Sequence, residues 1–173
     1  HDGDLFRLYI IGENPAMSDP NLNHARDALS RLKHLVVQDI FFTETCSYAD
    51  VILPASAFPE KTGTFTNTDR RVQMGRQALE LPGDTRQDLW IIQELAKRLG
   101  LAWDYSGPAE VFEEIRKAVP NMAGITWDRL EQEDSLTYPL LHEGDPGTPV
   151  IFISCAAPVS AGFGRAIILL SLR

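Results

Sequence analysis

Four polar residues have side chains that suit the recognition of a nucleotide. Asp39 and Asp88 are carboxylates that can each accept two hydrogen bonds side by side, from adjacent ribose hydroxyls or from the N1 and N2 edge of guanine. Lys61 is a point charge suited to a phosphate, and Asn14 offers both a donor and an acceptor. A nucleotide-containing ligand would satisfy all of these groups.

Motifs for catalysis or for metal binding are missing from the sequence. It contains no G-x-S-x-G elbow, no Walker loop, no H-E-x-x-H pair and no G-x-G-x-x-G after the first apolar run. Cys46 and Cys155 follow no metal-ligand spacing, and we expect Cys46 to be a small buried residue rather than a nucleophile. A catalytic pair of carboxylates is the alternative, although the acidic residues cluster on predicted helix faces. The sequence thus predicts a binding site with no catalytic residue and no metal ligand of its own.

Three apolar runs, at residues 5–11, 34–37 and 51–53, predict buried strands. A helix capped by Asn21 and running through Leu32 separates the first two, which indicates an α/β fold: a parallel, Rossmann-like sheet with helices on both faces. Ligands in such folds bind at the carboxyl ends of the strands. The first two runs are followed there by polar residues, namely Gly12, Glu13, Asn14, Gln38 and Asp39.

A long polar connection follows the third run, which stops at Pro54 because proline cannot donate to a sheet. It is rich in hydroxyls and contains Lys61, Gly63 and the Arg70-Arg71 pair. This composition suits an anionic ligand, because the cations supply charge and the glycine allows close approach of the backbone. A solvated surface loop is the alternative interpretation.

Helix signals place the remaining candidate residues. Thr43 is predicted to cap a short helix, with Phe42 and Ala49 packed inward. Asp88 opens the clearest helix of the chain, whose buried stripe is predicted to contain Leu89, Ile92, Leu95, Ala96 and Leu99. A stretch rich in proline and glycine at 138–149 predicts a boundary between a domain at 1–137 and a linker with an irregular tail at 138–173.

The length, composition and net charge of the chain argue against several classes of protein. The chain has 173 residues, of which 44% are hydrophobic and 23% charged, as is ordinary for a soluble globular protein. The net charge of −8 argues against general affinity for nucleic acid. No signal peptide and no apolar run long enough to span a membrane is apparent, so we expect a cytoplasmic protein with reduced cysteines.

Four blocks of sequence resemble the molybdopterin oxidoreductases, and within them the catalytic subunit of molybdenum- or tungsten-dependent formate dehydrogenase. The blocks are GENP at 12–15, VVQDIFFTET at 36–45, ADVILP at 49–54 and EKTGTFTNTDRRVQ at 60–73. The resemblance implies a bis-molybdopterin guanine dinucleotide cofactor, one dinucleotide of which lies on an α/β domain of this kind. By position in the similarity, which extends from Leu5 to Pro149, it implies dinucleotide contacts at Asn14, Gln38, Asp39, Lys61 and Asp88. Gly12, Glu13 and Thr43 are adjacent and are carried over less directly.

The same resemblance implies oxidation of formate to carbon dioxide, with electrons leaving through an iron-sulfur cluster. In the family, the metal ligand and the cluster cysteines lie in earlier sequence, and a barrel domain follows. We therefore expect a fragment whose partners are the missing segments and electron-transfer subunits. There are two alternatives. One is another member of the superfamily, such as a nitrate reductase, and the other is a non-catalytic nucleotide-binding or interaction domain. The unusually apolar segment at 153–163 departs from the family pattern.

Overall fold

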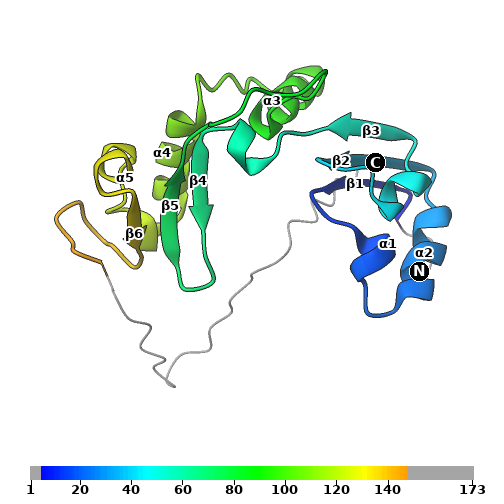
Figure 1. Cartoon of the computed structure of the whole chain (residues 1–173), viewed down its shortest axis with the longest axis horizontal. Helices are drawn as coiled ribbons and strands as arrows, with labels where there is room; N and C mark the ends of the chain where they lie inside the picture. Colours follow the sequence, from blue (N-terminus) through cyan, green and yellow to red (C-terminus); the bar gives the residue numbers. More distant parts are fainter. Residues whose placement is uncertain (1–4, 148–173) are drawn as a thin grey trace. The chain divides into compact units, whose positions relative to one another are not determined.

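The computed structural model describes residues 5–147, and these divide into two compact units. Unit 1 contains residues 5–56 and 81–86, and unit 2 contains residues 57–80 and 87–147. Each unit has its own sheet and helices, labelled in Figure 1. The predicted tail beyond Phe152 lies outside the described residues, and the predicted boundary at residue 138 stays a prediction.

Unit 1 is built on a three-stranded parallel sheet in the order β1-β2-β3, as the sequence predicted. The strands are β1 (Arg7–Ile11), β2 (His34–Asp39) and β3 (Val51–Pro54). The expectation that the third strand is buried was wrong: Val51 and Ile52 are 40% and 38% exposed. The reason is that β3 is an edge strand of the described sheet.

Short helices cover one face of this sheet (Figure 1): α1 (Pro15–Ser18) and α2 (Leu22–Ser30), with the 3-10 turn η1 (Glu44–Tyr48) before β3. The side chain of Asn21 accepts a hydrogen bond from the amide of His24, which confirms the predicted cap, although α2 ends two residues before Leu32. The core between sheet and helices consists of Ile10, Ala16, Leu29, Leu35, Val37 and Cys46. Cys46 is therefore the small buried residue that was predicted.

Unit 2 contains an antiparallel sheet that the sequence did not predict. Its order is β4-β5-β6, with β4 (Gly63–Thr66), β5 (Arg71–Gly75) and β6 (Ser135–Thr137). The long polar connection is thus a 3-10 turn, η2 (Phe58–Glu60), followed by a β-hairpin. Arg70 lies at the hairpin turn with a φ of 68°, a conformation that glycine adopts at less cost.

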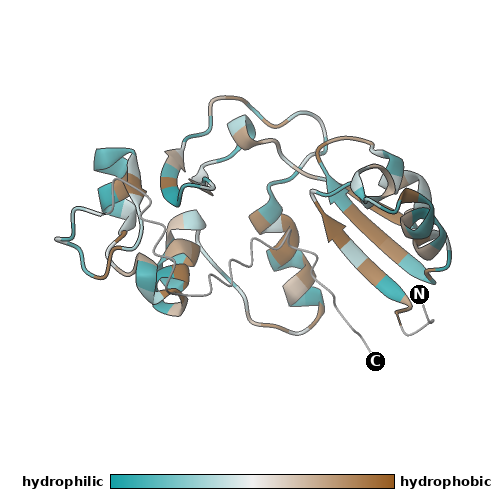
Figure 2. Ribbon diagram, turned by 90° about the horizontal axis from the view of Figure 1, so that it is seen from below, coloured by the Kyte–Doolittle hydropathy of each residue, from teal (hydrophilic) through white to brown (hydrophobic). Residues whose placement is uncertain are grey.

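The helices of unit 2 are α3 (Asp88–Arg98), α4 (Pro108–Ala118) and α5 (Trp127–Glu133), with a 3-10 turn η3 (Pro120–Met122). Of the predicted stripe of α3, Ala96 is buried and Leu89, Ile92 and Leu95 are half-buried, whereas Leu99 is 46% exposed. Ile91, which the predicted stripe did not include, is buried. Figure 2 shows apolar segments on the helices and strands of both units. The core of unit 2 contains Val72, Phe112, Ile125, Leu130, Leu136 and Leu140.

Candidate nucleotide-binding edge

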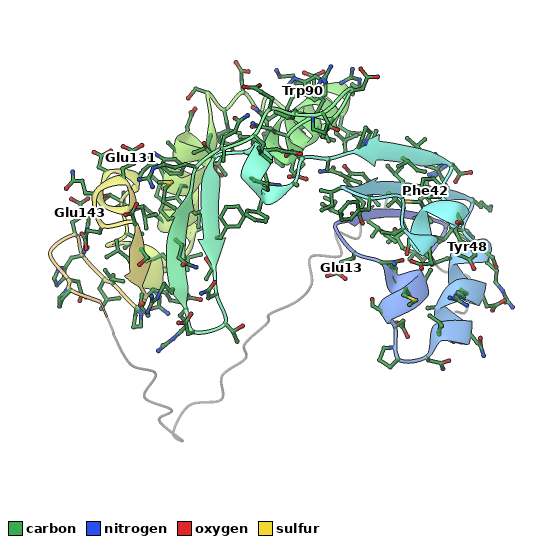
Figure 3. All side chains as sticks on the ribbon, in the orientation of Figure 1. Glu13, Phe42, Tyr48, Trp90, Glu131 and Glu143 are labelled. Carbon is green, nitrogen blue, oxygen red and sulfur yellow. The ribbon has the colours of Figure 1, made fainter. Side chains whose placement is uncertain are left out.

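The carboxyl edge of the parallel sheet in unit 1 carries the first group of predicted site residues. β1 ends at Ile11, and the amide of Gly12 donates to the carbonyl of Gln38 at 2.8 Å before the chain turns away. Gly12 has a φ of 61°, which glycine adopts readily. Glu13 follows directly (Figure 3), and Asp39 ends β2. These residues come together because parallel strands end at the same edge.

Asp39 is half-buried and is held by its own turn. Its Oδ1 atom accepts hydrogen bonds from the amides of Ile40 at 2.7 Å and Phe41 at 3.3 Å. Within residues 5–147, the Oδ2 atom of Asp39 has no hydrogen-bond partner. One carboxylate oxygen is therefore fixed by the backbone, and the other is able to accept from a ligand.

Asn14 uses its side chain within the protein. The Oδ1 atom accepts from the amide of Thr45 at 3.1 Å and from its hydroxyl at 2.7 Å, and Nδ2 donates to Glu44 at 2.6 Å. The hydroxyl of Thr45 also accepts from the amide of Ala16 at 3.1 Å. Asn14 thus ties the turn after β1 to the start of η1.

Gln38 and Thr43 also face protein atoms. The side chain of Gln38 is fully buried, and its Oε1 atom accepts a hydrogen bond from the hydroxyl of Tyr9. The hydroxyl of Thr43 lies 3.5 Å from the sulfur of Cys46. The predicted helix start after Thr43 is confirmed as η1, although its hydroxyl makes no cap bond to the backbone. In this structure Gln38 supports the sheet from within and does not line the edge.

The connection between β2 and η1 is apolar and open. Ile40, Phe41 and Phe42 are 46%, 73% and 75% exposed. Phe42, labelled in Figure 3, was predicted to pack inward, which was wrong, whereas Ala49 does pack against the core of unit 1. Large aromatic side chains left exposed beside polar groups are typical of surfaces that contact another molecule or segment.

Lys61 and Asp88 belong to unit 2, where they pair with each other. The Nζ atom of Lys61 donates to Oδ2 of Asp88 in an ion pair whose side chains are 27% and 28% exposed. Asp88 is also the acidic residue in the first turn of α3, where a carboxylate interacts favourably with the helix dipole. The sequence predicted Lys61 as a contact for a phosphate and Asp88 as a contact for a sugar or base, and it did not predict that they pair.

The electrostatics of the unit 1 edge are acidic. Glu13 and Asp39 lie on it, and Glu44 adjoins it through Asn14. The hydrogen bond from the Asn14 side chain, helped by a backbone amide, holds the pKa of the Glu44 carboxyl below its usual value. Carboxylates suit the N–H groups of guanine and the hydroxyls of ribose, but they repel a pyrophosphate.

Neither metal ligation nor a membrane span is indicated in the part of the chain that the structure describes. No group of three or more His, Cys, Asp or Glu side chains converges there in a way that would hold a metal ion. No helix within residues 5–147 combines the length and the apolar character needed to cross a bilayer. The described residues therefore offer polar contacts for a ligand, and no metal-binding cluster.

Sequence reasoning missed two residues at this edge. Thr45 is fully buried with its hydroxyl bonded on both sides, and Glu44 faces Asn14. Both lie in the block at 36–45 that carries the resemblance, but no spacing rule connects them to Asn14. Only the tertiary structure reveals this contact, because Asn14 and Thr45 are 31 residues apart in the sequence.

Comparison with known proteins agrees with the resemblance. A family model described as molybdopterin oxidoreductase matches residues 1–98. A putative formate dehydrogenase of Staphylococcus aureus strain USA300 is 44% identical over 153 residues, which cover 88% of this chain and 15% of that relative. The alpha subunit of an F420-dependent formate dehydrogenase from Methanocaldococcus jannaschii is 49% identical over 146 residues, covering 83% of this chain and 22% of that relative.

Among solved structures, acetylene hydratase from Pelobacter acetylenicus matches with a TM-score of 0.62 and 22% sequence identity. The match covers 78% of this chain and 18% of that one, and at this identity it shows the fold alone. The chain thus spans between 15% and 22% of the length of these relatives.

Proposed function

Because the chain belongs to the molybdopterin oxidoreductase family, we propose that it forms part of the catalytic subunit of a formate dehydrogenase. The observation that carries this proposal is the identity of 44% and 49% to proteins named formate dehydrogenase. That identity extends over 153 residues in the first case, more than one unit of the chain contains. The fold alone would not select this reaction, since a structural neighbour with the same fold is named a hydratase.

We further propose that the edge of unit 1 binds the guanine dinucleotide part of a bis-molybdopterin guanine dinucleotide cofactor. Asp39 would accept at Oδ2 a hydrogen bond from an N–H group of guanine or from a ribose hydroxyl. Gly12 and Glu13 would border the nucleotide, and the hydroxyl of Thr43 would add a polar contact. Gln38, which is fully buried, would act by supporting Tyr9 and the sheet.

The phosphates of such a cofactor need cations. Lys61 is the cation in this proposal, and Asp88 would share it with the ligand, since the two already form an ion pair. The residues present thus fit the nucleotide end of the cofactor.

When bound, the cofactor would supply a two-electron acceptor for the oxidation of formate, which yields carbon dioxide, one proton and two electrons. The residues of this chain would hold the nucleotide end and so fix the position of the cofactor. The whole subunit would also hold an iron-sulfur cluster, and its partners would be electron-transfer subunits. We place this activity in the cytoplasm.

The proposal is tested on the whole catalytic subunit that would contain this chain, purified from cells that make the cofactor. We expect molybdenum or tungsten, guanine nucleotide, and formate-dependent reduction of a viologen dye. Metal and guanine nucleotide without formate oxidation, but with oxidation of reduced dye by nitrate, would assign the chain to another reaction of the family. Absence of both metal and nucleotide would refute the cofactor proposal.

A further inference from the structure

Two connections at the carboxyl edge of unit 1 are joined by side chains. One is the turn after β1, at residues 12–14, and the other is the connection at residues 40–43 with η1 at its end. The Oδ1 atom of Asn14 accepts two hydrogen bonds from Thr45, at 3.1 Å from the amide and 2.7 Å from the hydroxyl. Its Nδ2 atom donates to Glu44 at 2.6 Å.

Thr45 is the centre of this network. Its side chain is fully buried, and its hydroxyl donates to Asn14 and accepts from the amide of Ala16 at 3.1 Å. A buried amide that loses its acceptor is costly, because no water replaces the lost bond. Removal of the Thr45 hydroxyl would therefore weaken the attachment of η1 to the turn after β1.

The connection at 40–43 has few other anchors. Its first amides, those of Ile40 and Phe41, donate to Asp39, and its apolar side chains are exposed. At its far end, the carbonyl of Thr43 accepts from the amide of Cys46 at 3.0 Å. The carbonyl of Phe41 accepts from the Cys46 thiol at 3.8 Å. Because Cys46 lies in η1, the position of η1 decides where the connection ends.

From these contacts we propose that Asn14 and Thr45 are positioning residues that hold the 40–43 connection, and through it the Asp39 carboxylate, in place for the nucleotide. The identity of the ligand rests on the proposed function, whereas the positioning role rests on the hydrogen bonds. Neither side chain has to touch the ligand. The lowered pKa of Glu44 agrees with this network, because the hydrogen bond from Asn14 is its main cause.

The test uses Thr45→Val in the full chain, which keeps the branched shape and removes the hydroxyl. Hydrogen exchange is measured at the amides of Ile40 and Phe41, which bond to Asp39 and not to Thr45. We expect exchange there to be roughly tenfold faster. Thr45→Ser, which keeps the hydroxyl, restores the slow exchange.

The matched control is Thr126→Val in unit 2, which also removes a threonine hydroxyl that accepts a hydrogen bond from an amide, that of Arg129 at 3.0 Å. It should lower stability and leave exchange at Ile40 unchanged. If Thr45→Val does not fold, Asn14→Ala, at a half-buried position, carries the same test. Unchanged exchange at Ile40, with faster exchange at the neighbouring Ala16 amide, would overturn the proposal.

A second readout connects the positioning role to the ligand. Calorimetry with guanosine diphosphate as the probe should give a Kd at least roughly fivefold higher for Thr45→Val than for wild type, with rescue by Thr45→Ser. Equal Kd values in wild type and Thr45→Val would overturn the proposed link to ligand binding. If wild type does not bind the probe but exchange at Ile40 still responds to Thr45→Val, the proposed function fails and the positioning role stands.

Discussion

The ion pair between Lys61 and Asp88 leads to a quantitative prediction. Two unit charges in contact near a protein surface attract by about 4 kcal/mol at an effective dielectric constant of 20, and desolvation and side-chain ordering offset most of this. Fully exposed pairs contribute about 0–1 kcal/mol. Because these side chains are only 27% and 28% exposed, we expect a coupling free energy of about 1–2 kcal/mol, between those limits.

A double-mutant cycle measures this coupling in urea unfolding. Lys61→Met and Asp88→Asn are made singly and together, and the coupling is the part of their effect on the free energy of unfolding that is not additive. The coupling should fall when salt is raised to about 1 M, because both side chains are still partly in contact with solvent. A coupling below about 0.3 kcal/mol would refute the reasoning.

Three further predictions concern stability and pH. Gly124→Ala should destabilise the fold by about 2–3 kcal/mol in urea unfolding, because its Cβ would lie 2.2 Å from a backbone carbonyl oxygen, whereas Gly107→Ala, with no atom within 4 Å, should have little effect. Phe112→Ala, at a core side chain that is 2% exposed, should cost about 3–5 kcal/mol, and a smaller loss would mean that the core of unit 2 collapses around the gap. Asn14→Ala should raise the pKa of Glu44 toward its ordinary value, measured by carbon-detected NMR titration. A lowered pKa stabilises the folded wild type at pH values above the ordinary carboxyl pKa, and this contribution is lost as the pH falls through the folded-state pKa. The variant should therefore lose less stability on acidification than wild type. An unchanged titration of Glu44 would exclude Asn14 as the cause of the lowered pKa.

The parallel sheet of unit 1 could be predicted because its strands carry local signals. Each apolar run ends in polar residues or proline. Asn21 caps α2 through a hydrogen bond to a residue only three positions away, so this signal is local as well. Burial was harder to predict. Phe42 and Val51 are apolar, yet both are exposed, because burial depends on what covers them and not on their own hydropathy.

The antiparallel sheet of unit 2 could not be predicted from its turn. Hairpin turns usually show glycine or asparagine at positions with a positive φ, and here Arg70 takes that conformation, so the connection resembled an irregular loop. β6 lies more than sixty residues further along the chain, and in the sheet Arg71 pairs with Thr137. No local sequence pattern predicts that pairing.

For the candidate site, the sequence offers residues of suitable types but not their contacts. The residue types suggested a nucleotide, and the strand ends placed Gly12, Glu13 and Asp39 on one edge. The partners of Asn14 and of Lys61 are distant in sequence, at 31 and 27 residues, so only the folded structure reveals them. The same structure makes Asn14 part of an internal network.

The measurement that tests the central claim most directly is the guanine nucleotide content of the purified protein, per folded chain, for wild type and Asp39→Asn. The variant keeps the size of the side chain but replaces a charged acceptor with a donor, at a cost of roughly 1.5–3 kcal/mol to a charge-assisted bond. Asp104→Asn, at a side chain that is 89% exposed, is the control. The account predicts nucleotide in wild type and in the control, and a clear loss in Asp39→Asn with the fold intact. Equal nucleotide content in all three proteins would contradict it.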